Sequence, residues 1–316
     1  MSETLVHNLK PCECCGSLQF NLVCERSDAN IWQCQNCALE SVNPLPDASD
    51  LKTIHRSEMD GAGTNSPYYL EYFEERQRRA ASYEKIYRSR LDLIERTLGK
   101  KGSLLDLGCG AGFFIRHAQQ SGWETQGLDI LPEYEQLAKE RLNFDRVRCA
   151  FLEDANLPPA SFDVVTLWDL IEHIPHPLDY LRQVNALLKM QGLVVLWTPN
   201  VKNSVYLKSR WTGYGPTQHI HFFSRATLER LLNQAGFKVV YAKTNKTKKG
   251  LLIPQESLSF EKIEKPADLP GRIGFAMKRD LKNFFNPLTY LDPILDWAGY
   301  GFNLLMIARK TRSLES

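Results

Sequence analysis

The sequence LLDLGCGAG, which ends at Gly112, constrains the fold of this chain more than any other segment. A short apolar run containing Asp106 leads into a G-x-G-x-G turn built on Gly108 and Gly110, and a helical pattern follows. Glycine tolerates positive φ and lets the backbone approach a ligand, so the segment predicts a strand, a ligand-binding turn and a helix. A dinucleotide-binding turn needs a further glycine where this chain has Phe113. An acid beside the glycines also repels a pyrophosphate and suits a cationic ligand.

Strand and helix patterns alternate from residue 103 onward. The expected strands are 104–107, 124–128, 146–149, 162–168, 192–198, 237–242 and 300–308. The expected helices are 113–121, 133–142, 178–189 and 225–235, after one long helix at 67–98. Such alternation predicts an α/β fold, in which a mostly parallel, Rossmann-like sheet is flanked by helices.

Polar and aromatic residues follow the predicted strands, at the sheet edge where ligands bind in this fold class. Asp129 lies about 20 residues past the first glycine, the spacing of a carboxylate that binds ribose hydroxyls. Phe151 and Leu152 could sandwich an adenine, and the indole of Trp168 could face a cation. Each feature alone also suits a solvated loop or core packing, but their order favours a nucleotide site. The predicted cofactor-binding set is Asp106, Gly108, Cys109, Gly110, Gly112, Asp129, Ile130, Phe151, Leu152 and Trp168.

The motifs of this region resemble those of the class I S-adenosylmethionine-dependent methyltransferases, and most closely the ubiquinone-biosynthesis O-methyltransferase type. The resemblance covers residues 103–242. It implies S-adenosylmethionine as the cofactor and a seven-stranded sheet whose last strand is antiparallel. The motifs that carry it are DLGCGAG at 106–112, LD at 128–129, SFDVV at 161–165, IEH at 171–173 and TPN at 198–200.

Six of the eight cysteines lie in the first forty residues. Cys12 and Cys15 form one C-x-x-C pair and Cys34 and Cys37 another, a spacing that predicts a four-thiolate zinc site. Cys14 breaks this spacing and is left out of the ligand set. The module resembles the zinc ribbons that precede methyltransferase domains in bacterial enzymes that modify small molecules and sugars, which implies a structural zinc. The alternative is a set of reduced thiols in a disordered tail.

The chain is expected to divide into five parts. They are a zinc-ribbon module at 1–46, a linker and N-terminal helix at 47–102, the cofactor-binding core at 103–244, an insertion, lid or substrate cap at 245–299, and the last strand and tail at 300–316. The first ten residues lack an apolar signal-peptide core and no apolar run could span a bilayer, so we expect a cytoplasmic protein. Peripheral membrane contact through residues 272–297 stays open, as does the oligomeric state.

Three histidines are candidates for a general base that takes a proton from an acceptor hydroxyl. His173 follows the fourth strand, whereas His219 and His221 alternate in an extended segment that places both on one face. Structural roles for all three are the alternative. A second hypothesis is a divalent ion held by Asp169, Glu172 and His173, with one of the two later histidines. This layout is similar to the Glu-x-x-Glu-His segment of small-RNA 2′-O-methyltransferases and metal-using ubiquinone-pathway enzymes, although the first position here is Asp.

The sequence thus predicts an enzyme that transfers a methyl group from S-adenosylmethionine to a hydroxyl of a small molecule, such as a sugar, a lipid-linked glycan or a secondary metabolite. One alternative is an RNA or protein methyltransferase, which the zinc module and the lysines of residues 243–249 support. The net charge of +2 argues against the broad basic face of a nucleic-acid binder. A non-catalytic protein that only binds S-adenosylmethionine is the other alternative.

Overall fold

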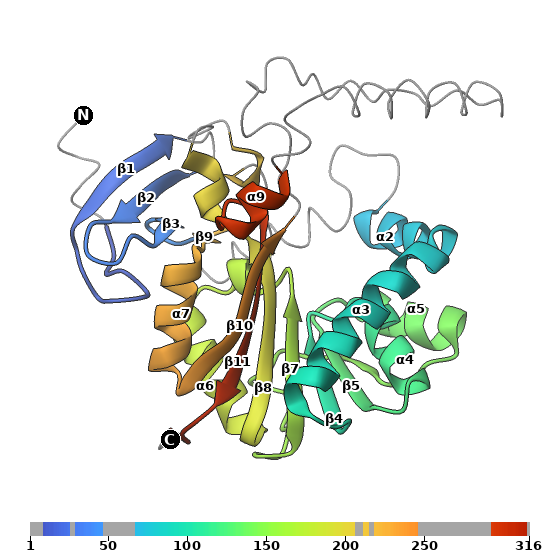
Figure 1. Cartoon of the computed structure of the whole chain (residues 1–316). Coiled ribbons are helices and arrows are strands. Elements are labelled where there is room, and N and C mark those ends of the chain that lie inside the picture. The colour runs from blue at the N-terminus through green and yellow to red at the C-terminus, as the bar shows by residue number, and fades with distance from the viewer. Residues whose placement is uncertain are drawn as a thin grey trace, which may run out of the picture.

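Two sheets organise the chain, a seven-stranded sheet that forms the body and a four-stranded sheet beside it (Figure 1). The structure is a computed structural model. It describes residues 9–25, 29–46, 67–205, 211–214, 218–245 and 292–314. Most of the predicted insertion or lid at 245–299 therefore lies outside the described residues.

The seven-stranded sheet has the order β10-β11-β8-β7-β4-β5-β6. The five strands from β8 to β6 run parallel to one another, and β11 pairs antiparallel with both β8 and β10. The predicted Rossmann-like sheet with an antiparallel last strand is confirmed. Its strands are β4 (Ser103–Leu107), β5 (Glu124–Asp129), β6 (Val147–Cys149), β7 (Phe162–Trp168), β8 (Leu188–Pro199), β10 (Phe237–Asn245) and β11 (Asn303–Lys310).

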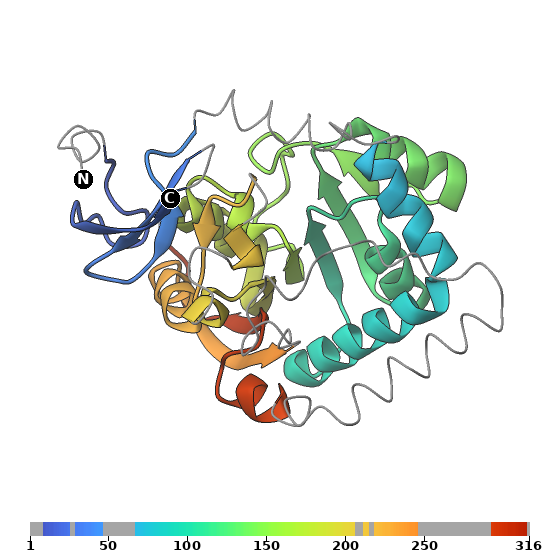
Figure 2. The same cartoon turned by 90° about the horizontal axis from the view of Figure 1, so that it is seen from above.

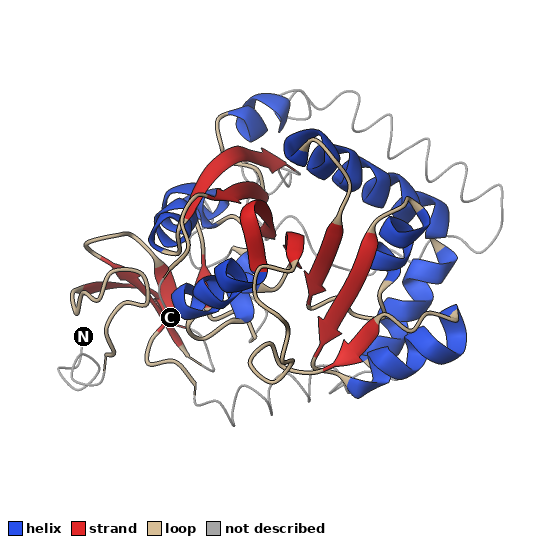
Figure 3. Cartoon of the chain, turned by 90° about the horizontal axis from the view of Figure 1, so that it is seen from below, coloured by secondary structure: helices blue, strands red, loops and turns tan. Residues whose placement is uncertain are grey.

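Helices cover both faces of this sheet (Figures 2 and 3). Successive side chains of a strand point to opposite faces. Thus Leu105 and Val165 pack with α6 and α7 in one apolar cluster, whereas Leu104 and Val164 pack with α3, α4 and α5 in another. A strand buried on both faces is rich in apolar residues along its length, as β7 is apart from Asp163 and Thr166, and its predicted bounds match. These helices are α4 (Phe113–Gln120), α5 (Pro132–Leu142), α6 (Pro177–Leu187) and α7 (Arg225–Gln234).

The single long helix predicted at 67–98 is wrong. The chain forms α2 (Tyr68–Arg78) and α3 (Ala80–Leu98), which meet at Arg79, where φ is −111° and ψ is 26°. The break lets α3 follow the sheet while α2 turns away from it (Figure 1). Both helices reach the cavity described below.

The four-stranded sheet joins the N-terminal module to the body of the protein. Its first three strands come from the cysteine-rich segment, and the fourth comes from the connection between β8 and α7. All neighbours in it are antiparallel. This shared sheet is not among the features predicted from the sequence. Its strands are β1 (Phe20–Glu25), β2 (Asn30–Cys34), β3 (Glu40–Val42) and β9 (His221–Phe222).

The short helix α9 (Asp292–Trp297) precedes β11, and it is the only described part of the amphipathic region expected at 272–297. Within the described ranges, no helix combines the length and apolarity that crossing a bilayer requires.

Candidate active site

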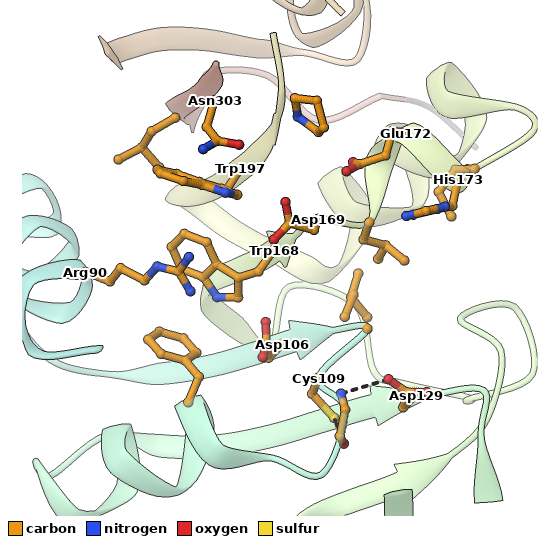
Figure 4. A pocket seen from close by; sticks show the side chains of 18 of the residues that line it. Arg90, Asp106, Cys109, Asp129, Trp168, Asp169, Glu172, His173, Trp197 and Asn303 are labelled. Carbon is orange, nitrogen blue, oxygen red and sulfur yellow. Dashed lines mark hydrogen bonds between the residues drawn. The ribbon is translucent and has the colours of Figure 1, made fainter. Parts of the chain in front are cut away.

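The glycine-rich turn after β4 is fixed by the carboxylate that ends β5. Asp129 accepts hydrogen bonds from two backbone amides, with its Oδ2 2.8 Å from Gly110 N and its Oδ1 3.1 Å from Leu131 N (Figure 4). Gly110 has φ 56°, and a Cβ there would lie 3.3 Å from the Tyr72 ring. The turn is therefore a tight backbone cradle that a side chain would crowd.

A cavity of about 1460 Å³ opens over this edge of the sheet. Gly112 does not line it, because this glycine faces inward, where a Cβ would come within 2.6 Å of Val147 Cγ2. The other predicted cofactor residues do line it. They are Asp106, Gly108, Cys109, Gly110, Asp129, Ile130, Phe151, Leu152 and Trp168.

Asp106 is a buried carboxylate at the floor of the cavity (Figure 4). Burial raises its pKa to about 7, although the hydroxyl of Thr166 and the charge of Arg90 oppose this rise. Thr166 Oγ1 donates to Asp106 Oδ1 over 2.5 Å. Asp106 can therefore change charge near neutral pH, which is typical of functional rather than surface carboxylates.

Arg90 of α3 also lines the cavity, although it is not among the site residues predicted from the sequence. Its guanidinium lies 3.8 Å from the ring centroid of Trp168 and 5.4 Å from that of Trp197 (Figure 4). Burial lowers the pKa of Arg90, and the negative charges of Asp169 and Asp106 oppose that shift. The cation that meets Trp168 is thus supplied by the chain itself. A signal existed, because Arg90 lies three residues after the buried Tyr87 and so shares the inward face of the helix.

His173 and His219 lie together in the lining of the cavity, with ring centroids 4.8 Å apart. Nδ1 of His173 is 3.0 Å from the carbonyl oxygen of Gln218, and Nδ1 of His219 is 3.2 Å from that of Gly213. A carbonyl only accepts hydrogen bonds, so each neutral ring carries its proton on Nδ1. Nε2 is then the basic nitrogen of both rings.

His221 lies elsewhere. It is buried in β9, its Nε2 is 3.0 Å from the carbonyl oxygen of Pro175, and it is not among the residues that line the cavity. Burial lowers its pKa to about 4, so the ring is neutral at physiological pH. The expected pairing of His219 and His221 on one face does not form. The structure brings His219 to His173 instead.

Glu172 completes this side of the cavity. Its Oε2 accepts from the Thr198 hydroxyl over 2.9 Å, and its buried Oε1 has no hydrogen-bond partner among the described residues. Burial raises the pKa of Glu172 well above its usual range, and the charge of Asp169 adds to this. Glu172, His173 and His219 each offer a ligand atom within 4.8 Å of the others. Asp169, with φ 52°, lines the cavity but is not part of that group.

The four predicted zinc ligands also lie together. Their ligand sulfurs are all within 4.8 Å of one another. The Sγ atoms of Cys12 and Cys37 are 3.5 Å apart, as are those of Cys15 and Cys34. Zinc–sulfur bonds of about 2.3 Å in a tetrahedron place the sulfurs roughly 3.8 Å apart. The arrangement thus fits a zinc ion with small adjustments.

The comparisons with known proteins agree with this fold. The sequence model of the methyltransferase domain family matches residues 72–242, more than half of the chain. The ubiquinone biosynthesis O-methyltransferase of Neisseria meningitidis is 29% identical over 170 residues, which cover 49% of this chain and 71% of that protein. The protein of the same name from Leptothrix cholodnii is 34% identical over 119 residues, 35% of this chain and 51% of that protein.

The fold is also found among solved structures. A SAM-dependent methyltransferase from Archaeoglobus fulgidus superposes with a TM-score of 0.50 at 20% identity, covering 76% of this chain and 99% of that one. A strand order with an antiparallel β11, a glycine turn held by Asp129 and the family match define a class I methyltransferase. The chain belongs to the methyltransferase domain family and is a S-adenosylmethionine-dependent enzyme of that class. It matches the curated relatives over about half to seven-tenths of their length.

Proposed function

We propose that this enzyme methylates a hydroxyl group of a small molecule in the cavity between the glycine turn and His219. The observation that carries the proposal is that one cavity is lined both by Asp106 and Asp129 beside the glycine turn and by the two contacting imidazoles of His173 and His219. Relatives at 29% and 34% identity are named O-methyltransferases, which supports oxygen as the methylated atom.

The residues of the cavity fit S-adenosylmethionine. Asp106 and Arg90 offer opposite charges for the amino and carboxylate groups of its methionine end. Asp129 lines the cavity as a carboxylate that could accept hydrogen bonds from ribose hydroxyls, and Phe151 and Leu152 supply apolar surface for the adenine. When bound, the cofactor supplies an electrophilic methyl group. The chain supplies orientation and a site sheltered from water.

His219 is the proposed general base, and His173 is the alternative. Both rings line the cavity with Nδ1 committed to a carbonyl, so Nε2 can accept the acceptor's proton as the hydroxyl oxygen attacks. His221, from outside the cavity, provides a control position.

A divalent cation is a second way in which the same residues could activate a hydroxyl. Glu172, His173 and His219 form the donor set, so of the expected set of Asp169, Glu172, His173 and one later histidine, only Asp169 is absent. The unpartnered buried Oε1 of Glu172 favours this reading, because a cation would satisfy it and ionise the carboxyl group. A bound ion would lower the pKa of a coordinated hydroxyl.

The N-terminal module is proposed to hold one structural zinc on Cys12, Cys15, Cys34 and Cys37. Four thiolates leave no open coordination position, so this ion would take no part in methyl transfer. The support is the sulfur geometry described above.

The test is transfer of a labelled methyl group to fractionated small-molecule extracts and to defined hydroxyl compounds. We expect a methylated product whose formation falls about 10²- to 10⁴-fold in His219→Ala, as for loss of a general base. His221→Ala should turn over at nearly the wild-type rate if it folds. Label found in RNA or protein but in no small molecule would overturn the proposed acceptor class. Activity that EDTA removes and Mg²⁺ restores, with the zinc content unchanged, would select the cation over the base.

A further inference from the structure

The N-terminal module and the acceptor side of the active site share backbone hydrogen bonds. In the β3–β9 pairing, Ser41 lies opposite His221, and Val42 N donates to Ile220 O over 2.9 Å. Ile220 N donates in turn to the carbonyl oxygen of Glu172 over 3.0 Å. The residue between His219 and His221 is therefore held on one side by the module and on the other by the active site.

A buried carboxylate of the module reaches the same segment. Glu40 of β3 is only 7% exposed and accepts two hydrogen bonds, one from the hydroxyl of Tyr214 and one from Gln33 Nε2 at 2.9 Å. Its surroundings are apolar, with Tyr214, Trp211 and Phe222 in one cluster. Burying a carboxylate is costly unless its hydrogen bonds are satisfied, so loss of the bond from Tyr214 would leave an oxygen of Glu40 buried without that donor.

Tyr214 ends the short turn Thr212–Tyr214. Gly213, the middle residue of that turn, contacts His219. The Gly213 carbonyl is the acceptor for His219 Nδ1, and both residues line the cavity. No side chain fits at Gly213, because a Cβ there would lie 2.3 Å from the Trp211 ring. A change at Glu40 can thus reach the His219 imidazole in steps. Glu40 is hydrogen-bonded to the Tyr214 hydroxyl, and the peptide group that joins Tyr214 to Gly213 carries the carbonyl that His219 contacts.

We propose that Glu40 is a positioning residue, by which the N-terminal module fixes the orientation and tautomer of the His219 imidazole through Tyr214 and the Gly213 carbonyl. The inference rests on the proposed role of His219. It gives the module a part in the reaction through its protein contacts, separate from any metal that it holds.

The variants interrupt this chain of contacts from its two ends, so that a shared effect of Tyr214→Phe and Glu40→Ala points to the contact between them. Tyr214→Phe removes one hydroxyl and keeps the ring packed against Trp211 and Phe222. Glu40→Ala removes the acceptor, whereas Glu40→Gln keeps an oxygen that can accept from Tyr214. The matched control is Gln234→Ala, which cuts a different contact between body and module, from Gln234 Nε2 to the carbonyl oxygen of Cys14 at 3.0 Å.

The readout that does not need the acceptor is ¹⁵N NMR of histidine-labelled full-length protein, with the His219 signals assigned by their loss in His219→Ala. We expect a Nδ1-protonated ring in the wild type, in Gln234→Ala and largely in Glu40→Gln. Tyr214→Phe and Glu40→Ala should show a mixture of tautomers. With the acceptor in hand, these two variants should lose about ten- to a hundredfold in kcat, the scale of a small misplacement, with cofactor Kd unchanged.

An unchanged tautomer in both Tyr214→Phe and Glu40→Ala overturns the inference, and Glu40 is then only a packing residue. If Glu40→Ala does not fold, Tyr214→Phe decides alone. A changed tautomer without the loss of kcat refutes the role proposed for His219 and leaves the positioning contact standing.

Discussion

The charge of Asp106 should make cofactor binding depend on pH. Its pKa is about 7, and the cofactor carries an ammonium group that an ionised carboxylate attracts. Raising the pH ionises Asp106, so affinity should rise with pH. If only the ionised form binds, the apparent Kd scales with 1 + 10^(pKa − pH). This factor is about 11 at pH 6 and about 1.1 at pH 8, a tenfold gain in affinity across the range.

The assay is titration calorimetry with S-adenosylhomocysteine, the demethylated product, at pH 6, 7 and 8. Asp106→Asn should remove the pH dependence and bind at least about tenfold more weakly at pH 8. Thr166→Val removes a donor to the ionised carboxylate, so it should move the rise to higher pH. The control is Asp145→Asn, at a carboxylate that is 83% exposed. A wild-type affinity that is flat from pH 6 to 8, with Asp106→Asn binding as tightly, would refute the reasoning.

Three further results are expected. Asp129→Ala should weaken binding of S-adenosylhomocysteine by about 1.5–3 kcal/mol, because it removes hydrogen bonds to a charged group, and calorimetry will show whether it does. Arg90→Gln should weaken the same binding at every pH, whereas Arg88→Gln, at an exposed position of α3 that does not line the cavity, should leave it unchanged; equal losses would mean that general charge, not a specific contact, is responsible. Purified protein should carry about one zinc per chain, and Cys34→Ser should lower that content and the melting temperature. Full zinc retention in that variant would place the ion elsewhere.

Local patterns were enough to predict the body of the fold. The strand at 162–168 is buried on both faces and matches its predicted bounds, because a short, mostly apolar run with Val164 and Val165 at its centre is typical of a buried strand. The cysteine spacing predicted the thiol cluster and the glycine turn predicted the ligand-binding loop for a similar reason. Each feature depends on residues that are close together in the sequence. The sulfurs of Cys12, Cys15, Cys34 and Cys37 do converge in the structure.

Contacts between distant segments were not predictable in this way. β9 is only two residues long, and nothing in its local sequence states that it pairs with β3. Neither Gly nor Pro marks the break at Arg79, so the helical pattern reads through it. In the sequence, Arg90 is one more charge on an amphipathic helix. Its partners Trp168 and Trp197 come from β7 and β8, far along the chain, so only the folded structure brings them to it.

The shared four-stranded sheet has a consequence for how this chain is made. Tyr214 follows its partner Glu40 by 174 positions, and β9 lies still farther along. During synthesis from the N-terminus, β3 must wait with an unpaired edge until residues 221–222 have emerged. An open edge of this kind is a template for pairing with another chain. Products that stop short of β9 should therefore aggregate. In the full chain, β9 pairs with β3 and covers this edge.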